Sequence, residues 1–193
     1  MTTAPSGRRG AQAPEPRIAV LCEAPAWRRA FPRPLTRLRQ AAALTLRQSG
    51  ALSPAGRDEL SLLLTDDESQ QELNSLWRGR DSSTNVLSFP DGTALPEGGR
   101  SLGDVSLAFE TCRREAQEQG KSLADHATHL VVHGVLHLLG HDHEEPGEAE
   151  AMEALEVQLL AELGIADPYA EGETSEAAQA VTGRVEPTSS ERL

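Results

Sequence analysis

Aromatic residues are scarce in this chain of 193 residues: they make up 3% of it, as three Phe, two Trp and one Tyr. Hydrophobic residues make up 38%, so a buried core must be mainly aliphatic. No run approaches the roughly 20 apolar residues that a membrane-spanning helix needs. Arg8 and Arg9 are followed by no apolar block, so the N-terminal stretch does not resemble a secretory signal. The sequence therefore predicts a protein without a membrane partner.

Cysteine is also rare, with Cys22 and Cys112 as the two examples. Two cysteines do not make the disulfide framework of a small secreted domain. We expect both to be free, buried thiols and the protein to be cytoplasmic.

Net positive charge is lacking, since the formal charge is −12, and this argues against a protein that coats nucleic acid without specificity. The acidity is uneven. Residues 17–100 hold 11 basic and 10 acidic side chains, whereas residues 101–165 hold 3 basic and 13 acidic ones. The N-terminal half could present a local basic face, so a polyanionic substrate is not excluded. Arg33, Arg37 and Arg47 either form a solvated helix surface or follow an RNA backbone.

One domain is expected over residues 17–165. Residues 1–16 and the acidic segment 166–193 have little to bury and are expected to be disordered tails. Apolar periodicity and capping residues predict four strands and five helices between them. The predicted strands are 17–22, 59–64, 86–89 and 104–108, and the predicted helices are 34–49, 67–77, 109–119, 123–139 and one after Pro146. In the second of these helices, Leu73 and Leu76 are expected to face inward. This order indicates an α+β domain with a small mixed sheet of about four strands and flanking helices.

Three histidines at ligand spacing lie at the end of one predicted helix. His133 and His137 are four residues apart, so they lie one turn above each other on the same helix face. Gly140 can take the left-handed conformation that ends a helix, and the returning chain then brings His143 back toward them. The sequence therefore predicts a metal site on a central helix with these three histidines as ligands.

Three imidazoles without a thiolate suit Zn²⁺, one ion per chain, although Ni²⁺ and Cu²⁺ are chemically possible. Three protein ligands leave a fourth position open, which is typical of catalytic zinc sites. The spacing is that of metzincin zinc proteases, but Gly134 stands where such proteases carry a catalytic Glu. Asp142 and Glu144 remain alternative bases, although nothing in their spacing requires that role.

The remaining histidines are assigned by position. His129 shares the face of His133 and is expected to be a hydrogen-bonded supporting residue. His126 is expected to be solvated near the helix start, and His141 is a neighbour and possible spare ligand.

Three blocks of sequence resemble the YbeY family of rRNA-maturation endoribonucleases. They are Leu73-Asn-Ser-Leu-Trp-Arg78-Gly-Arg-Asp, Thr84-Asn-Val-Leu-Ser-Phe-Pro90 and His133 to His143. The resemblance extends over most of residues 17–165. His141 departs from the family pattern, which commonly has Tyr there, and the acidic C-terminal tail lies outside it.

The resemblance implies a zinc-dependent endoribonuclease specific for single-stranded RNA. It implies action in rRNA maturation near the 3′ end of small-subunit RNA and in ribosome quality control, with the small subunit and its assembly factors as partners. The family's zinc ligands fall on His133, His137 and His143, and its functionally important arginine falls on Arg78.

Arg78 suits that role chemically, because its planar guanidinium matches phosphate oxygens and stays charged at every working pH. The residues do not distinguish water from the RNA 2′-hydroxyl as the nucleophile. Two rival functions remain: a zinc protease, which Gly134 disfavours, and a noncatalytic ribosome-assembly factor whose zinc only stabilises the fold.

Overall fold

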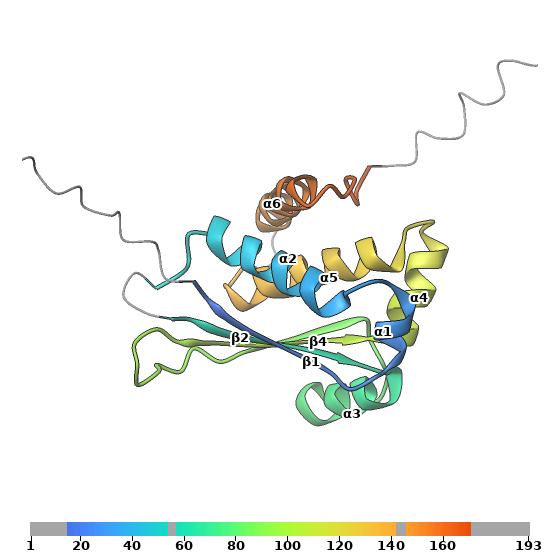
Figure 1. Cartoon of the computed structure of the whole chain (residues 1–193), viewed down its shortest axis with the longest axis horizontal. Coiled ribbons are helices and arrows are strands. Elements are labelled where there is room, and N and C mark those ends of the chain that lie inside the picture. The colour runs from blue at the N-terminus through green and yellow to red at the C-terminus, as the bar shows by residue number, and fades with distance from the viewer. Residues whose placement is uncertain (1–14, 54–56, 142–145, 171–193) are drawn as a thin grey trace, which may run out of the picture.

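The computed structural model describes residues 15–53, 57–141 and 146–170. These segments hold four strands and six helices (Figure 1). The strands are β1 (Arg17–Cys22), β2 (Glu59–Thr65), β3 (Val86–Pro90) and β4 (Ser101–Ala108). The helices are α1 (Ala26–Ala30), α2 (Pro34–Gln48), α3 (Asp67–Arg78), α4 (Phe109–Glu118), α5 (Leu123–Leu138) and α6 (Pro146–Glu162).

The strands form one mixed sheet in the order β1-β2-β4-β3. β1, β2 and β4 run parallel to one another, whereas β3 is antiparallel to β4 and forms an edge. The α+β prediction with four strands is confirmed. β4 begins at Ser101 rather than at Asp104, because its first residues pair with β2 and β3.

The helices cover the two faces of the sheet unequally. In Figure 1, α2 and α5 lie on one face, α6 lies beyond them, and α3 lies on the opposite face. Alternation in β2 fits this arrangement, since Leu60, Leu62 and Leu64 are buried while Ser61 is exposed. No helix within the described segments is long and apolar enough to span a membrane.

The core is mainly aliphatic, as expected, with one aromatic cluster. Trp27 of the short helix α1 is fully buried and donates from Nε1 to the Thr65 carbonyl at 2.9 Å. Its ring makes edge contacts with Phe31 and Phe109, at centroid distances of 6.3 and 5.3 Å. α1 was not predicted, because five residues are too few to show helical periodicity.

The predicted helix ends are largely confirmed. Asp66 caps α3 by accepting from the Ser69 amide at 3.0 Å, and Ser122 caps α5 by accepting from the Asp125 amide at 3.0 Å. Leu76 was expected to face inward, but its side chain is 77% exposed because α3 covers only part of the sheet. Most of both predicted tails lies outside the described residues, so their disorder stays a prediction.

Two arginines of α2 are engaged by carboxylates. Arg37 is paired with Asp125 and donates from Nε to Thr128 at 3.0 Å, so it ties α2 to α5. Arg47 lies 3.4 Å from Glu15. Cys22 and Cys112 are both free, with Cys112 buried and Cys22 partly exposed. Burial raises the pKa of the Cys112 thiol, which keeps it protonated at neutral pH.

Candidate metal centre

α5 ends just before Gly140, as the sequence predicted. Gly140 adopts a left-handed conformation with φ of 87°. Its amide donates to the His137 carbonyl at 3.0 Å, and the His141 amide donates to the Leu136 carbonyl at 3.1 Å. This pair of bonds is the Schellman motif, which ends the helix.

His133 and His137 converge at this end of the helix. Their Nε2 atoms lie 3.1 Å apart, and their ring centroids are 4.5 Å apart. Two nitrogens bound to one tetrahedral Zn²⁺ at about 2.0–2.1 Å lie about 3.3 Å from each other. The two imidazoles therefore have the separation of neighbouring ligands on one ion, and the residues fit a zinc site.

A buried carboxylate orients the first of these imidazoles. Glu156 of α6 is 0% exposed, and its Oε1 lies 2.7 Å from Nδ1 of His133. Hydrogen bonding to a carboxylate makes Nδ1 the protonated nitrogen of a neutral ring, so the lone pair is on Nε2. The ring then presents Nε2 as a metal ligand, on the side where His137 lies.

Glu156 is held by more than His133. Its Oε2 lies 2.9 Å from Nε2 of His129 and accepts the hydroxyl hydrogen of Tyr169. Burial alone would raise the pKa of Glu156, but the hydrogen bonds from His129, His133 and Tyr169 outweigh it and lower the pKa to about 2. The carboxylate is thus a buried anion that fixes two imidazoles. The supporting role expected for His129 agrees with this contact.

Glu156 was not predicted as part of the site. Tyr169 lies in the segment 166–193, which was predicted to be a disordered tail. A signal for Glu156 was present, since it lies four residues from Met152 and three from Leu159, both of which are buried. A Glu on the apolar stripe of a helix needs a buried partner, and a histidine-rich helix is the natural candidate.

The third predicted ligand, His143, lies outside the described residues, as do Asp142 and Glu144. Within residues 15–53, 57–141 and 146–170, no group of three His, Cys, Asp or Glu side chains forms a metal site. The three-histidine set therefore stays a prediction. His141, the possible spare ligand, is described and partly exposed.

Arg78 is the last residue of α3, which ends at Gly79 in the left-handed conformation. Its exposed guanidinium donates to the backbone carbonyl of Ser88 in β3 at 3.2 Å. The Ser88 hydroxyl in turn donates to the carbonyl of Gly134 at 3.1 Å. Arg78 is thereby tied through the edge strand to the residue that follows His133.

Gly134 lies where α5 packs on the sheet. A Cβ there would lie 2.8 Å from Cγ1 of Val105 and 3.1 Å from Oγ of Ser88. A side chain at this position would meet these sheet residues at once. The absent protease-type Glu is therefore excluded by packing as well as by identity.

The expectation for His126 is wrong. It is 4% exposed, and its Nε2 lies 2.9 Å from Glu115 of α4. Burial lowers its pKa more than this neighbouring carboxylate raises it. The helix begins against α4 rather than in solvent, so the first histidine of α5 is a core residue.

Comparisons with known proteins agree with this architecture. The model of the family described as Endoribonuclease YbeY matches residues 32–164. A protein of that name from Paramagnetospirillum magneticum is 54% identical over 160 residues, which cover 80% of this chain and 96% of the relative. One from Methylocella silvestris is 48% identical over 157 residues, covering 81% of this chain and 88% of the relative.

A solved structure shares the fold. The solution structure of a Thermotoga maritima protein has a TM-score of 0.50 and 22% sequence identity to this chain. It covers 76% of this chain and 91% of that protein. With the family match over most of the folded segment, these findings show that the chain belongs to the YbeY family.

Proposed function

We propose that this protein is a zinc-dependent endoribonuclease that cleaves single-stranded RNA. The observation that carries the proposal is the pair of imidazole nitrogens 3.1 Å apart on α5, with His133 oriented by the buried carboxylate of Glu156. The names of the relatives support the RNA-cleaving activity.

In this proposal His133, His137 and His143 hold one Zn²⁺. Zinc in such a site polarises a phosphate oxygen and makes water a stronger nucleophile near neutral pH. Glu156 keeps the proton of His133 on Nδ1, so that Nε2 stays available as a ligand.

Arg78 binds the scissile phosphate. Its guanidinium is exposed, and its tie to Ser88 keeps it beside the strand that contacts α5. A fixed cation at this position stabilises the negative charge that gathers on phosphate oxygens in the transition state. The geometry thus separates two tasks, with the imidazoles holding the metal and the guanidinium holding the substrate.

The cellular role in this proposal is rRNA maturation at the 3′ end of the small-subunit RNA, together with ribosome quality control in the cytoplasm. Small-subunit assembly intermediates are the expected partners. The formal charge of −12 supports such a partner, because the protein has little general attraction for RNA and needs its substrate to be positioned.

Cleavage of a single-stranded RNA by purified protein tests this function. We expect the wild type to cleave, the chelated protein to be inactive, and added Zn²⁺ to restore activity. His133→Ala removes a ligand and is expected to abolish cleavage, while Arg78→Ala lowers it on the order of 100-fold or more.

Two controls sharpen the assay. A duplex of the same sequence tests strand specificity and should be cleaved slowly. Equal cleavage by the wild type, His133→Ala and Arg78→Ala would show a contaminating nuclease and contradict the proposal. Zinc binding without RNA cleavage would favour the noncatalytic assembly factor instead.

A further inference from the structure

The sheet face opposite α5 opens into a cleft of about 960 Å³. All four strands and the C-terminal end of α3 line it, because α3 leaves part of this face uncovered. The volume suits a ligand of nucleotide size. Arg78 lines the cleft, so the proposed phosphate-binding residue lies at this opening as well as beside β3.

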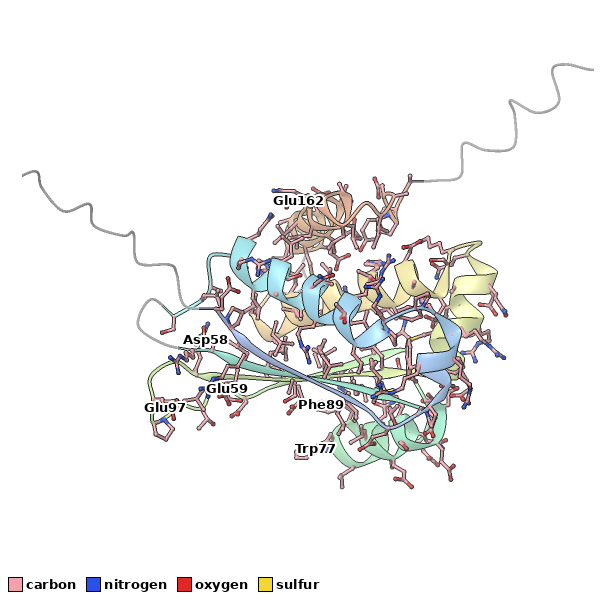
Figure 2. The ribbon with its side chains drawn as sticks, viewed as in Figure 1. Asp58, Glu59, Trp77, Phe89, Glu97 and Glu162 are labelled. Atoms are coloured by element: carbon pink, nitrogen blue, oxygen red, sulfur yellow. The ribbon has the colours of Figure 1, made fainter. Side chains whose placement is uncertain are left out.

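Two of the chain's few aromatic side chains lie together in this cleft. Trp77 is 67% exposed, and its ring lies 6.1 Å from that of Phe89, tilted by 59°. Figure 2 shows both on the side of the sheet that α3 occupies. Exposed aromatic rings beside a cation are the usual platform for an unpaired nucleobase, since every base has a face that stacks.

The charges in the cleft favour a base over a phosphate. Three carboxylates, Glu23, Asp91 and Asp104, line it together with the single cation Arg78. These carboxylates repel phosphate, but they accept hydrogen bonds from the N–H groups of a neutral base. A nucleotide therefore fits with its phosphate at Arg78 and its base inside.

Asp104 is the carboxylate best placed to contact the base. It lies directly opposite Phe89 in the register of β3 and β4, so the two side chains share a face of the sheet. Asp91 already accepts hydrogen bonds from Thr93. Among the described residues, the side chain of Asp104 makes no hydrogen bond or ion pair, and the residue is exposed.

We propose that this cleft binds an unpaired guanine base, stacked on Trp77 and hydrogen-bonded by Asp104. Guanine presents a ring N–H and an amino group side by side, which match the two oxygens of a carboxylate. Uracil lacks the amino group. The proposal rests on the proposed function, because it gives the endoribonuclease a preference for RNA with an unpaired guanine near the cleaved bond.

Calorimetric titration of the full chain with mononucleotides tests this site, since these probes contain no bond that the enzyme cleaves. Guanosine 5′-monophosphate is compared with inosine 5′-monophosphate, which lacks only the amino group, and with uridine 5′-monophosphate. We expect guanosine monophosphate to bind about fivefold or more tightly than either. Quenching of tryptophan emission should accompany binding, because Trp77 is exposed whereas Trp27 is fully buried.

Three variants assign the contacts. Trp77→Leu should weaken guanosine monophosphate about tenfold or more through lost stacking. Asp104→Asn should bind the guanosine and inosine nucleotides equally. Leu76→Ala is the matched control, because Leu76 is 77% exposed on the same helix but does not line the cleft, and its affinities should equal those of the wild type.

Equal affinity of the wild type for the guanosine and inosine nucleotides would overturn the proposal. So would unchanged binding by Trp77→Leu with the wild-type fold, checked by circular dichroism. The cleavage assay on single-stranded RNA is read separately. Cleavage without guanosine monophosphate binding would contradict the guanine site and support the proposed function. Trp77-dependent binding without cleavage would support the guanine site and contradict the proposed function.

Discussion

The two faces of the sheet are built for different purposes. One face is closed by α2 and α5, with Leu60, Leu62 and Val105 fully or almost fully buried against them. The opposite face is closed only in part by α3, and it exposes Leu21 and Trp77. The closed face holds α5 rigidly and so fixes the histidines, while the open face leaves room for a ligand. Arg78 donates to the Ser88 carbonyl of β3, the edge strand.

Breaking the closed face should have the largest effect. Gly134→Glu forces a side chain into Val105 and Ser88, where a Cβ alone lies 2.8 and 3.1 Å away, and it buries a charge. We expect the free energy of unfolding to fall by roughly 3 kcal/mol or more. Urea denaturation measures it.

Gly147→Glu is the control for that change, since a Cβ at this helical position meets nothing within 4 Å. Its stability should be close to that of the wild type. A Gly134→Glu protein as stable as the wild type would contradict the packing argument. Peptidase activity in that protein would favour the zinc-protease hypothesis.

Removing the carboxylate that orients His133, on the closed side of the sheet, should have the next largest effect. Glu156→Gln removes the anion that His129 and His133 share, so His133 loses its fixed proton on Nδ1. We expect zinc affinity to fall roughly 10- to 100-fold, as measured by competition with a chromogenic chelator.

Glu150→Gln is the matched variant on α6, because Glu150 is exposed. It should bind zinc as the wild type does. Unchanged zinc affinity in Glu156→Gln would mean that the carboxylate only stabilises the fold.

The residues of α5 and Glu156 of α6 differ in how far the sequence could reveal them. His133, His137 and Gly140 follow from spacing, because the helical repeat and the left-handed glycine are local properties. Glu156 is supplied by another helix, and its contact depends on how α6 packs on α5, which periodicity does not encode.

The same distinction explains the errors. Leu76 and His126 were assigned from position along their own helices. Their exposure is decided by how far α3 overlaps the sheet and by the approach of α4. The four strands were predicted because apolar runs are local, whereas their order depends on non-local pairing.

At the edge strand β3, Arg78→Lys should have a moderate effect on RNA cleavage. Lysine keeps the charge but loses the fork that donates to Ser88 and matches phosphate oxygens. We expect RNA cleavage to fall about tenfold, with stability changed by less than about 0.5 kcal/mol because the side chain is exposed. Arg80→Lys, an exposed neighbour, should cleave normally. Normal cleavage by Arg78→Lys would indicate general electrostatic attraction rather than a phosphate clamp, because lysine keeps the charge, and equal losses in both variants would mean that Arg78 has no special part.

The smallest expected effect concerns pH and the core end of α5. Burial lowers the pKa of His126 in the folded protein, whereas in the unfolded chain the imidazole takes up its proton near pH 6.5. The unfolded state therefore binds more protons, and stability is lost as the pH falls below about 6.5. His126→Gln removes this loss, so its unfolding free energy should decline less between pH 7.5 and pH 5. Urea denaturation with a chelator present measures it, and parallel declines in both proteins would contradict the assignment.

Zinc stoichiometry of the full chain tests whether three histidines hold one zinc. Purified protein is dialysed against micromolar Zn²⁺ and its metal content is measured for the wild type, His133→Ala, His137→Ala and His143→Ala. We expect one zinc per wild-type chain and a loss of tight binding in each variant. A wild type that retains no zinc, or a His143→Ala protein that binds it as tightly as the wild type, would contradict the three-histidine centre.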